Sequence, residues 1–232
     1  MTNNTLSYKI HGAPAYATVE IQLKPGEQVI AEAGAMDYMD GTVQISTSAS
    51  GGLIKGLKRK LSGESFFMNI FTGPGSVFFS SSVPGDIMPF EVSPIENGGW
   101  ILSKDAFIVG TPNLEISSKW GGFKSILGGE GAFLTKVSTK EGHGMFFAGA
   151  YGAIQKHEIP SGKEFVVDTG LFFAAKEDVK FEISKVGGMK SFLLGGEGLV
   201  LRFYGPATIY TQSRTLSGLA LTLAKFLPSS QS

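Results

Sequence analysis

The chain of 232 residues contains no cysteine, and its other scarcities are informative too. Without thiols, the protein can have no disulfide, no cysteine nucleophile and no cysteine-ligated metal site. Charged residues make up only 17% of the chain, where about 25% is ordinary for a globular domain. The 20 basic and 20 acidic side chains cancel, so the chain as a whole has no electrostatic attraction to nucleic acid or to an anionic membrane.

Long hydrophobic runs are absent as well. A membrane-spanning helix needs roughly 18 consecutive apolar residues, whereas the densest runs here are short, at residues 170–175 and 199–204. The first residues, MTNNTLSYKIHG, lack the basic start and apolar core of a secretory signal. We therefore expect no transmembrane segment and a cytoplasmic location.

Glycine, by contrast, is abundant, and it marks an internal repeat. The chain has 32 glycines, roughly twice the usual share. Gly-Gly pairs begin at positions 51, 121 and 187, which are 70 and 66 residues apart. Around each pair the order is the same: an alternating strand pattern, the Gly-Gly pair, a lysine-bearing turn, a Gly-Glu step and a second apolar strand. The three segments that align in this way are residues 40–71, 111–137 and 177–203.

The repeats predict an all-β protein. Apolar and polar residues alternate with a period of two, as in Val43-Gln44-Ile45-Ser46, and turn signals recur between the strand patterns. We expect a single domain of three antiparallel β-sandwich-like repeats, at roughly residues 7–85, 86–151 and 152–212, followed by a tail at 213–232. Leucines at helical spacing between Thr215 and Phe226 predict one short helix in this tail, packed on a sheet face or on a neighbouring subunit.

The sequence also resembles a known family. The Gly-Gly turn, the stretch GLKRKLSGESFFMNIFTGPG at residues 56–75 and the threefold repetition resemble the AIM24 family over essentially the whole chain. The resemblance implies an antiparallel fold similar to that of the tryptophan RNA-binding attenuator protein, with three units about a pseudo-threefold axis. It implies no established biochemical activity.

The lysine-bearing turns are the strongest local signal for binding. Each places cations beside apolar residues at equivalent positions of the repeat, a combination that suits a lipid headgroup boundary or a stacked base. The alternative is a solvated turn whose lysines discourage pairing at a sheet edge. The candidate surface-binding residues are Lys55, Lys58, Arg59, Lys119, Trp120, Lys124, Lys185 and Lys190.

One glutamate per repeat follows the turn glycine, at Glu64, Glu130 and Glu197. A pseudo-threefold axis would bring these carboxylates into a ring that could share a proton or hold a cation. The alternative is a local capping device that gene duplication has copied three times.

Catalytic and cofactor motifs are not found. His11, His143 and His157 lack the spacing of a zinc site and are interpreted as exposed turn residues. The glycine-rich stretches at 122–125 and 188–191 lack the glycine that precedes lysine in a phosphate-binding loop. A spatial Ser-His-Asp triad stays open, although no nucleophile elbow marks one. We expect no metal and no cofactor.

These observations support three hypotheses. The first is a non-enzymatic, self-associating β scaffold or binding module, with a homo-oligomer, most simply a trimer, favoured by the low charge and the many apolar strand residues. The second is a binder of anionic lipid or RNA through the basic turns. The third is an enzyme of a class whose motifs the sequence does not reveal.

Overall fold

The computed structural model describes residues 6–47, 68–95, 98–120, 133–185 and 199–227, and in these residues the chain is almost entirely β structure. Nineteen described strands form four sheets, and every pair of neighbouring strands in them is antiparallel. The predicted all-β class is therefore confirmed. None of the helices within these ranges is long and apolar enough to cross a membrane.

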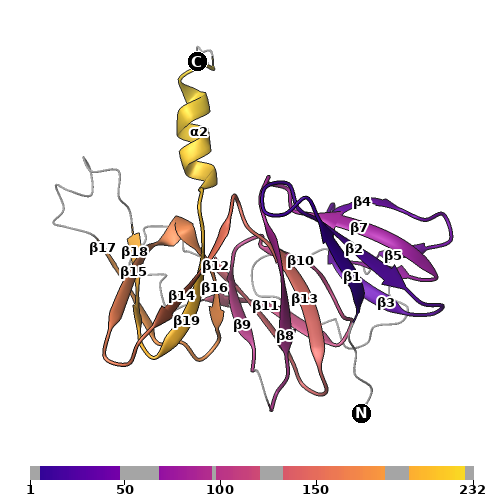
Figure 1. Cartoon of the computed structure of the whole chain (residues 1–232), viewed down its shortest axis with the longest axis horizontal. Coiled ribbons are helices and arrows are strands. Elements are labelled where there is room, and N and C mark those ends of the chain that lie inside the picture. Colours follow the sequence, from indigo (N-terminus) through magenta and orange to yellow (C-terminus); the bar gives the residue numbers. More distant parts are fainter. Residues whose placement is uncertain (1–5, 48–67, 96–97, 121–132, 186–198, 228–232) are drawn as a thin grey trace.

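The four sheets follow one another from one end of the molecule to the other (Figure 1). At one end lies a four-stranded sheet, in the order β1 (Ser7–His11), β2 (Thr18–Leu23), β7 (Gly75–Ser80) and β4 (Met36–Met39). Next comes a six-stranded sheet, in the order β5 (Gln44–Thr47), β6 (Met68–Thr72), β3 (Gln28–Glu32), β10 (Phe107–Gly110), β13 (Gly144–Gly149) and β8 (Ile87–Val92).

The second six-stranded sheet has the order β11 (Leu114–Trp120), β12 (Phe133–Thr139), β9 (Trp100–Ser103), β16 (Phe172–Lys176), β19 (Ala207–Gln212) and β14 (Ile154–Ile159). At the far end is a three-stranded sheet of β15 (Glu164–Asp168), β18 (Leu199–Tyr204) and β17 (Phe181–Lys185), in that order. A short 3₁₀ turn, η1 (Thr169–Leu171), connects β15 to β16.

Three hydrophobic cores fill the spaces between successive sheets. The first contains Val19 and Phe79 from the four-stranded sheet and Phe147 from the neighbouring sheet. The second lies between the two six-stranded sheets, where Phe90 stacks on Phe146 with ring centroids 5.1 Å apart. The third joins the second six-stranded sheet to the three-stranded sheet. Three cores in one chain account for its low charge, because the two middle sheets are covered on both faces.

The same strand pairing recurs three times along the chain. In the first unit, β7 lies between β2 and β4, and β6 lies between β5 and β3; the second and third units repeat both triplets. We call β4, β10 and β16 the β4-type joining strands, and β3, β9 and β15 the β3-type joining strands. Each six-stranded sheet forms where a β3-type strand of one unit pairs with the β4-type strand of the next. The pseudo-threefold axis that the family resemblance implies stays a prediction.

A local irregularity also recurs. Each β4-type strand carries a register shift against its partner at the same place, between Met36 and Tyr38, between Phe107 and Val109, and between Phe172 and Ala174. Such a β-bulge re-aims the strand and strengthens its twist. A bulge therefore marks every β4-type joining strand.

The connections between the units meet each other. Gly85, between the first two units, forms a β-bridge with Gly152, between the second and the third. A Cβ atom at Gly85 would lie only 1.9 Å from the carbonyl oxygen of Ala150, so no other residue fits without a shift of the backbone. The two connections thus fasten the three units at one place.

The predicted helix is present as α2 (Leu216–Ala224), which Thr215 caps by accepting a hydrogen bond from the Gly218 amide. None of its residues is buried, and it projects away from the sheets (Figure 1). Its leucines do not cover a sheet face of their own chain, so that part of the expectation is wrong. Whether they pack on a neighbouring subunit is untested.

Candidate functional site

The residues expected to bind an anionic surface and those of the glutamate ring lie, with three exceptions, outside the described residues. The exceptions are Lys119 and Trp120, at the end of β11, and Lys185, at the end of β17, for which the structure gives the strand position alone. The residues outside the description are Lys55, Lys58, Arg59, Lys124, Lys190, Glu64, Glu130 and Glu197. Both predicted sites therefore stay predictions, as do the glycine-rich stretches at 122–125 and 188–191.

The histidines are not all turn residues, which corrects one expectation. His143 does lie in a turn before β13, but His11 ends β1 and His157 lies within β14. The ring of His157 lies within hydrogen-bonding distance of the Thr211 hydroxyl, at 2.9 Å, and packs on Phe165. In the described part of the chain, no group of three His, Asp or Glu side chains could hold a metal ion.

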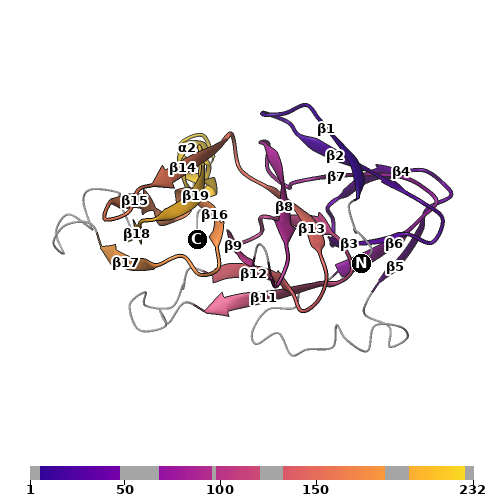
Figure 2. The same ribbon diagram turned by 60° about the horizontal axis from the view of Figure 1, so that its bottom comes forward.

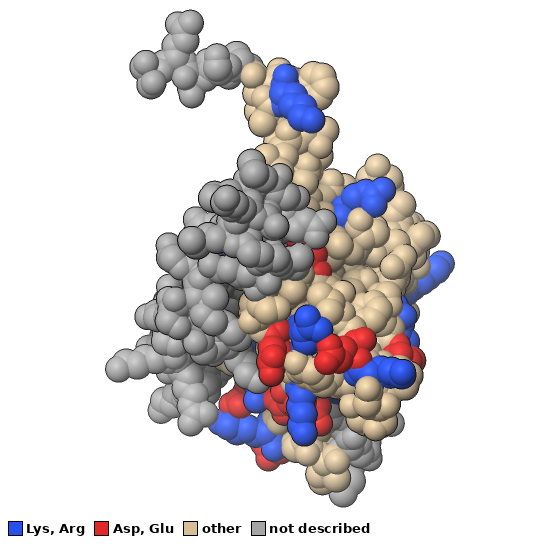
Figure 3. All heavy atoms as spheres, turned by 90° about the vertical axis from the view of Figure 1, so that its left-hand side faces the viewer, with Lys and Arg blue, Asp and Glu red and all other residues tan. Residues whose placement is uncertain are grey.

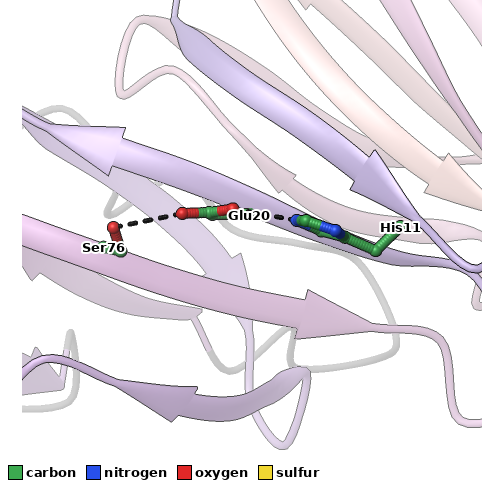
Figure 4. Close-up of polar contacts among 3 residues, drawn as sticks. All are labelled: His11, Glu20 and Ser76. Carbon is green, nitrogen blue, oxygen red and sulfur yellow. Dashed lines mark hydrogen bonds and ion pairs between the residues drawn. The ribbon is translucent and has the colours of Figure 1, made fainter.

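A histidine, a glutamate and a serine do meet on the first sheet, across β1, β2 and β7 (Figure 4). His11 Nε2 lies 2.8 Å from Glu20 Oε2, and the Ser76 hydroxyl donates to Glu20 Oε1 over 3.3 Å. In a catalytic triad the histidine stands between the acid and the serine, so that it can take the serine's proton. Here the carboxylate stands in the middle, so this group is a cross-strand polar contact that does not activate the serine.

The described residues enclose a pocket of about 1000 Å³, at the upper end of the size range of ligand sites. The turns that join β3 to β4, β9 to β10 and β15 to β16 all contribute to its wall. Residues that follow β7, β13 and β19 complete it. All three units therefore line this one pocket with equivalent parts of their chain.

The three turns correspond residue by residue. Residues 29–36, 100–107 and 165–172 each comprise the last four residues of a β3-type strand, the turn, and the first residue of a β4-type strand. Glu32, Ser103 and Asp168 hold one equivalent position among them. The backbone carbonyls of Glu32 and Ser103 accept the same turn hydrogen bond, from the amide three residues later, over 3.1 and 3.4 Å. Equivalent positions thus carry different chemistry in each unit.

Glu32 is the titratable group that this setting perturbs most clearly. Burial, with a smaller contribution from the negative charge of Asp105, raises the pKa of Glu32 from 4.5 to about 7. Its carboxylate makes no ion pair among the described residues that could offset this effect. Around neutral pH, Glu32 is therefore divided between a carboxylate and a neutral acid, which can donate as well as accept a hydrogen bond.

Asp105 itself has an unusual backbone. Its φ of 61° makes it the one non-glycine residue with positive φ in the described ranges, and it stands where the first unit has Gly34, whose φ is 92°. Aspartate enters this region more readily than most residues, although at a cost relative to glycine. An aspartate where the fold favours glycine therefore places a carboxylate on the pocket wall at the expense of backbone strain.

The sequence contains a signal for this pocket. A strand, a turn and a second strand recur upstream of each Gly-Gly pair, and the three turns meet in the structure. The polar residue Glu32 ends β3, and Asp105 and Thr169 lie in the turns that follow β9 and β15. Their convergence depends on how the units pack, which alternation along one strand does not reveal.

The comparisons with known proteins agree with this architecture. A family model described as mitochondrial biogenesis AIM24 matches residues 8–214, which include all nineteen described strands except the first residue of β1. The chain belongs to the AIM24 family. The matched region ends just before Thr215 and α2, so most of the pocket lies within the AIM24 unit and the start of α2 adds to its rim.

Relatives in the AIM24 family are similar over their whole length. An uncharacterised protein of Streptococcus pyogenes serotype M6 is 28% identical over 242 residues, which cover 99% of this chain and 94% of the relative. A crystal structure of a Streptococcus pyogenes protein is 26% identical with a TM-score of 0.76, and the match covers 96% of this chain and 100% of the other. These likenesses support the AIM24 fold and carry no biochemical activity with them.

Proposed function

We propose that this AIM24 protein is a non-enzymatic binding module that takes a small polar ligand into the pocket between its three units. The observation that carries the proposal is that equivalent turns of all three units converge on one pocket, where Glu32 and Asp105 lie close enough for their charges to interact. A concave site with a few convergent polar groups and a perturbed titratable residue is the usual form of a ligand site.

Among its described residues, the wall holds one lysine, Lys104, beside the carboxyl groups of Glu32 and Asp105, and these two carboxyl groups favour a ligand with a cationic or hydrogen-bond-donating group. The pocket is also lined by serine and threonine hydroxyls and by Gln212. Gln212 itself is held in place, because its amide bonds to the Gly170 carbonyl and the Tyr151 amide. A cation beside Glu32 would favour its charged form, so binding would release a proton. Affinity is therefore expected to rise as the pH rises through about 7.

The experiment is a thermal-shift and calorimetric titration with spermidine, guanidinium and tetramethylammonium at pH 6 and pH 8. We expect at least one of these cations to raise the melting temperature more at pH 8, and Glu32→Gln to abolish that difference. The matched control is Glu91→Gln, a substitution of an exposed glutamate on β8. If wild type and Glu32→Gln respond alike, or if none of the cations binds, the cation-binding proposal is wrong.

A second proposed function is binding to an anionic lipid surface through the lysine-bearing turns. The exposed apolar side chains of α2 and the residues after it favour this function, because they could enter the same surface. This helix exposes Leu221 by 71%, and Phe226 just beyond it by 82%, beside a single cation, Lys225. Polybasic segments contribute on the order of 1 kcal/mol per cation near an anionic membrane. We expect wild type to bind phosphatidylserine vesicles at low salt and Lys58→Glu/Arg59→Glu to bind less. Binding to single-stranded RNA but not to vesicles would assign the same segments to RNA.

A further inference from the structure

The joining strands at the two ends of the molecule lack the partners that their equivalents have. β3 pairs with β10, and β9 pairs with β16, each pair connecting one unit to the next. Among the described strands, β15 pairs only with β18, and β4 pairs only with β7. The two unpaired edges lie at opposite ends of the molecule in both ribbon views (Figures 1 and 2).

The register at the two internal junctions shows how such a pair would form. Val109 lies opposite Ala31 at the first junction, and Ala174 lies opposite Leu102 at the second. In the aligned units, Tyr38 of β4 holds the position of Val109 and Ala174, and Val167 of β15 holds that of Ala31 and Leu102. The same alignment places Met39 opposite Val166. The bulge beside Tyr38 matches those of β10 and β16, so β4 already has the shape of a joined strand.

Burial at these positions changes from the middle of the molecule to its ends. Ile30 and Ile101, on the internal β3-type strands, are 1% and 0% exposed, whereas Val166, their equivalent on β15, is 46% exposed. Val109 and Ala174 are fully buried, whereas Tyr38 on β4 is 58% exposed. Each end therefore exposes apolar side chains at positions that the internal junctions bury. One end carries a β3-type strand and the other a β4-type strand, which are the two kinds of strand that pair at an internal junction.

We propose that β15 of one copy pairs with β4 of a second copy, head to tail, in the register of the internal junctions. The three strands at one end and the four at the other, 3 + 4, would then form one seven-stranded sheet, in the order β17-β18-β15-β4-β7-β2-β1. The two surfaces differ, so the contact is heterologous and extends into a ring or an open filament according to the rotation between copies. The trimer expected from sequence would be one such ring.

One residue weakens this contact relative to the internal ones. Asp37 stands at the bulge position that Ile108 and Phe173 occupy at the internal junctions, where both are buried. Its carboxylate accepts a hydrogen bond of 2.7 Å from the Ser80 hydroxyl. A charge on a sheet edge is a common protection against uncontrolled pairing. Among the residues that the structure describes, the end with β15 shows acidic and basic side chains intermixed (Figure 3). We therefore expect the contact to be reversible in the native protein.

Directed cross-linking tests the register. Because the chain has no native cysteine, every disulfide that forms must involve the introduced residues. Antiparallel partners have Cα atoms about 4.5 to 5.5 Å apart, which is within disulfide range. We expect an equimolar mixture of Met39→Cys and Val166→Cys, once oxidised, to give a dimer band. The control mixture, Met39→Cys with Ile95→Cys, uses a residue that is 94% exposed and lies far from either edge strand in sequence, and it should give no dimer above each variant alone.

Sedimentation velocity tests the interface itself. Wild type is expected to sediment faster as its concentration rises, and Val166→Lys should abolish this shift, while Ile95→Lys should not. Asp37→Ile, which restores the residue type of the internal junction, should lower the dissociation constant of the contact at least tenfold. The proposal is overturned if wild type and Asp37→Ile both stay monomeric, or if the double variant Met39→Cys/Val166→Cys cross-links within one chain at monomer mass.

Discussion

At the scale of single residues, Glu32 connects the pocket to the stability of the fold. Its pKa of about 7 in the folded chain lies above the ordinary value of 4.5, so the folded state holds this proton more tightly than the unfolded state does. The resulting stabilisation is complete below pH 4.5 and is lost as the pH rises through about 7.

Glu32→Gln should remove this dependence. From pH 5 to pH 8, we expect the free energy of unfolding of wild type to fall relative to that of the variant. The difference should be on the order of 1 to 2 kcal/mol, because solvent screens a group that is only partly buried. Urea denaturation across this pH range measures it, with Glu91→Gln as the control. A pH profile that is identical for wild type and Glu32→Gln would contradict the assigned pKa.

Asp105 gives a second prediction at this scale, because its φ of 61° favours glycine. Alanine has neither the freedom of glycine nor the local hydrogen bonds that help aspartate at positive φ. We expect the free energy of unfolding of Asp105→Ala to be about 1 kcal/mol lower than that of Asp105→Gly. Chemical denaturation compares the two variants, and equal stabilities would show that the backbone at this turn carries no strain. Asp105→Gly should also lower the pKa of Glu32, since the neighbouring charge is removed.

At the scale of elements, the sequence predicted the strands better than the turns between them. Alternation predicted the half-buried strand β11, which begins at Leu114. The apolar run at 170–175 proved to hold the first four residues of β16, a strand covered on both faces. The pocket could not be predicted in this way. Glu32 and Thr169 are 137 residues apart, and they line one pocket only because the six-stranded sheets bring the units together.

The helix α2 can be removed at little cost to the fold. None of its side chains is buried, and its hydrogen bonds are local, as in the cap from Thr215 to Gly218. We expect a chain that ends at Arg214 to keep its free energy of unfolding to within about 0.5 kcal/mol. Thermal and urea unfolding of both lengths will measure the difference. A large loss would show that α2 packs on something that the single chain does not contain, such as a second copy.

At the scale of the whole molecule, the units depend on one another. In the second unit, β10 pairs with β3 of the first unit, and β9 pairs with β16 of the third. The aromatic cluster around Phe90 likewise combines Phe146 and Trp100 of the second unit with Phe173 and Tyr210 of the third.

We therefore expect residues 86–151 alone not to fold. Both joining strands would lose a neighbour, and the apolar side chains of the central core would be exposed to solvent. Circular dichroism and the dispersion of amide signals in NMR spectra would measure this, with the full chain as the reference. A cooperative unfolding transition in the isolated segment would show that the unit is a domain in its own right.

The recurring junction has a consequence for how such chains can change in evolution. Every unit carries one β4-type strand and one β3-type strand, and at both internal junctions the β3-type strand of one unit pairs with the β4-type strand of the next. Duplication or loss of one entire unit would leave the same two kinds of terminal strand and would demand no new contact surface. Recombination can thus alter the number of units in a chain in one step. The shape of the junction is harder to change, because every unit would have to change together with its neighbours.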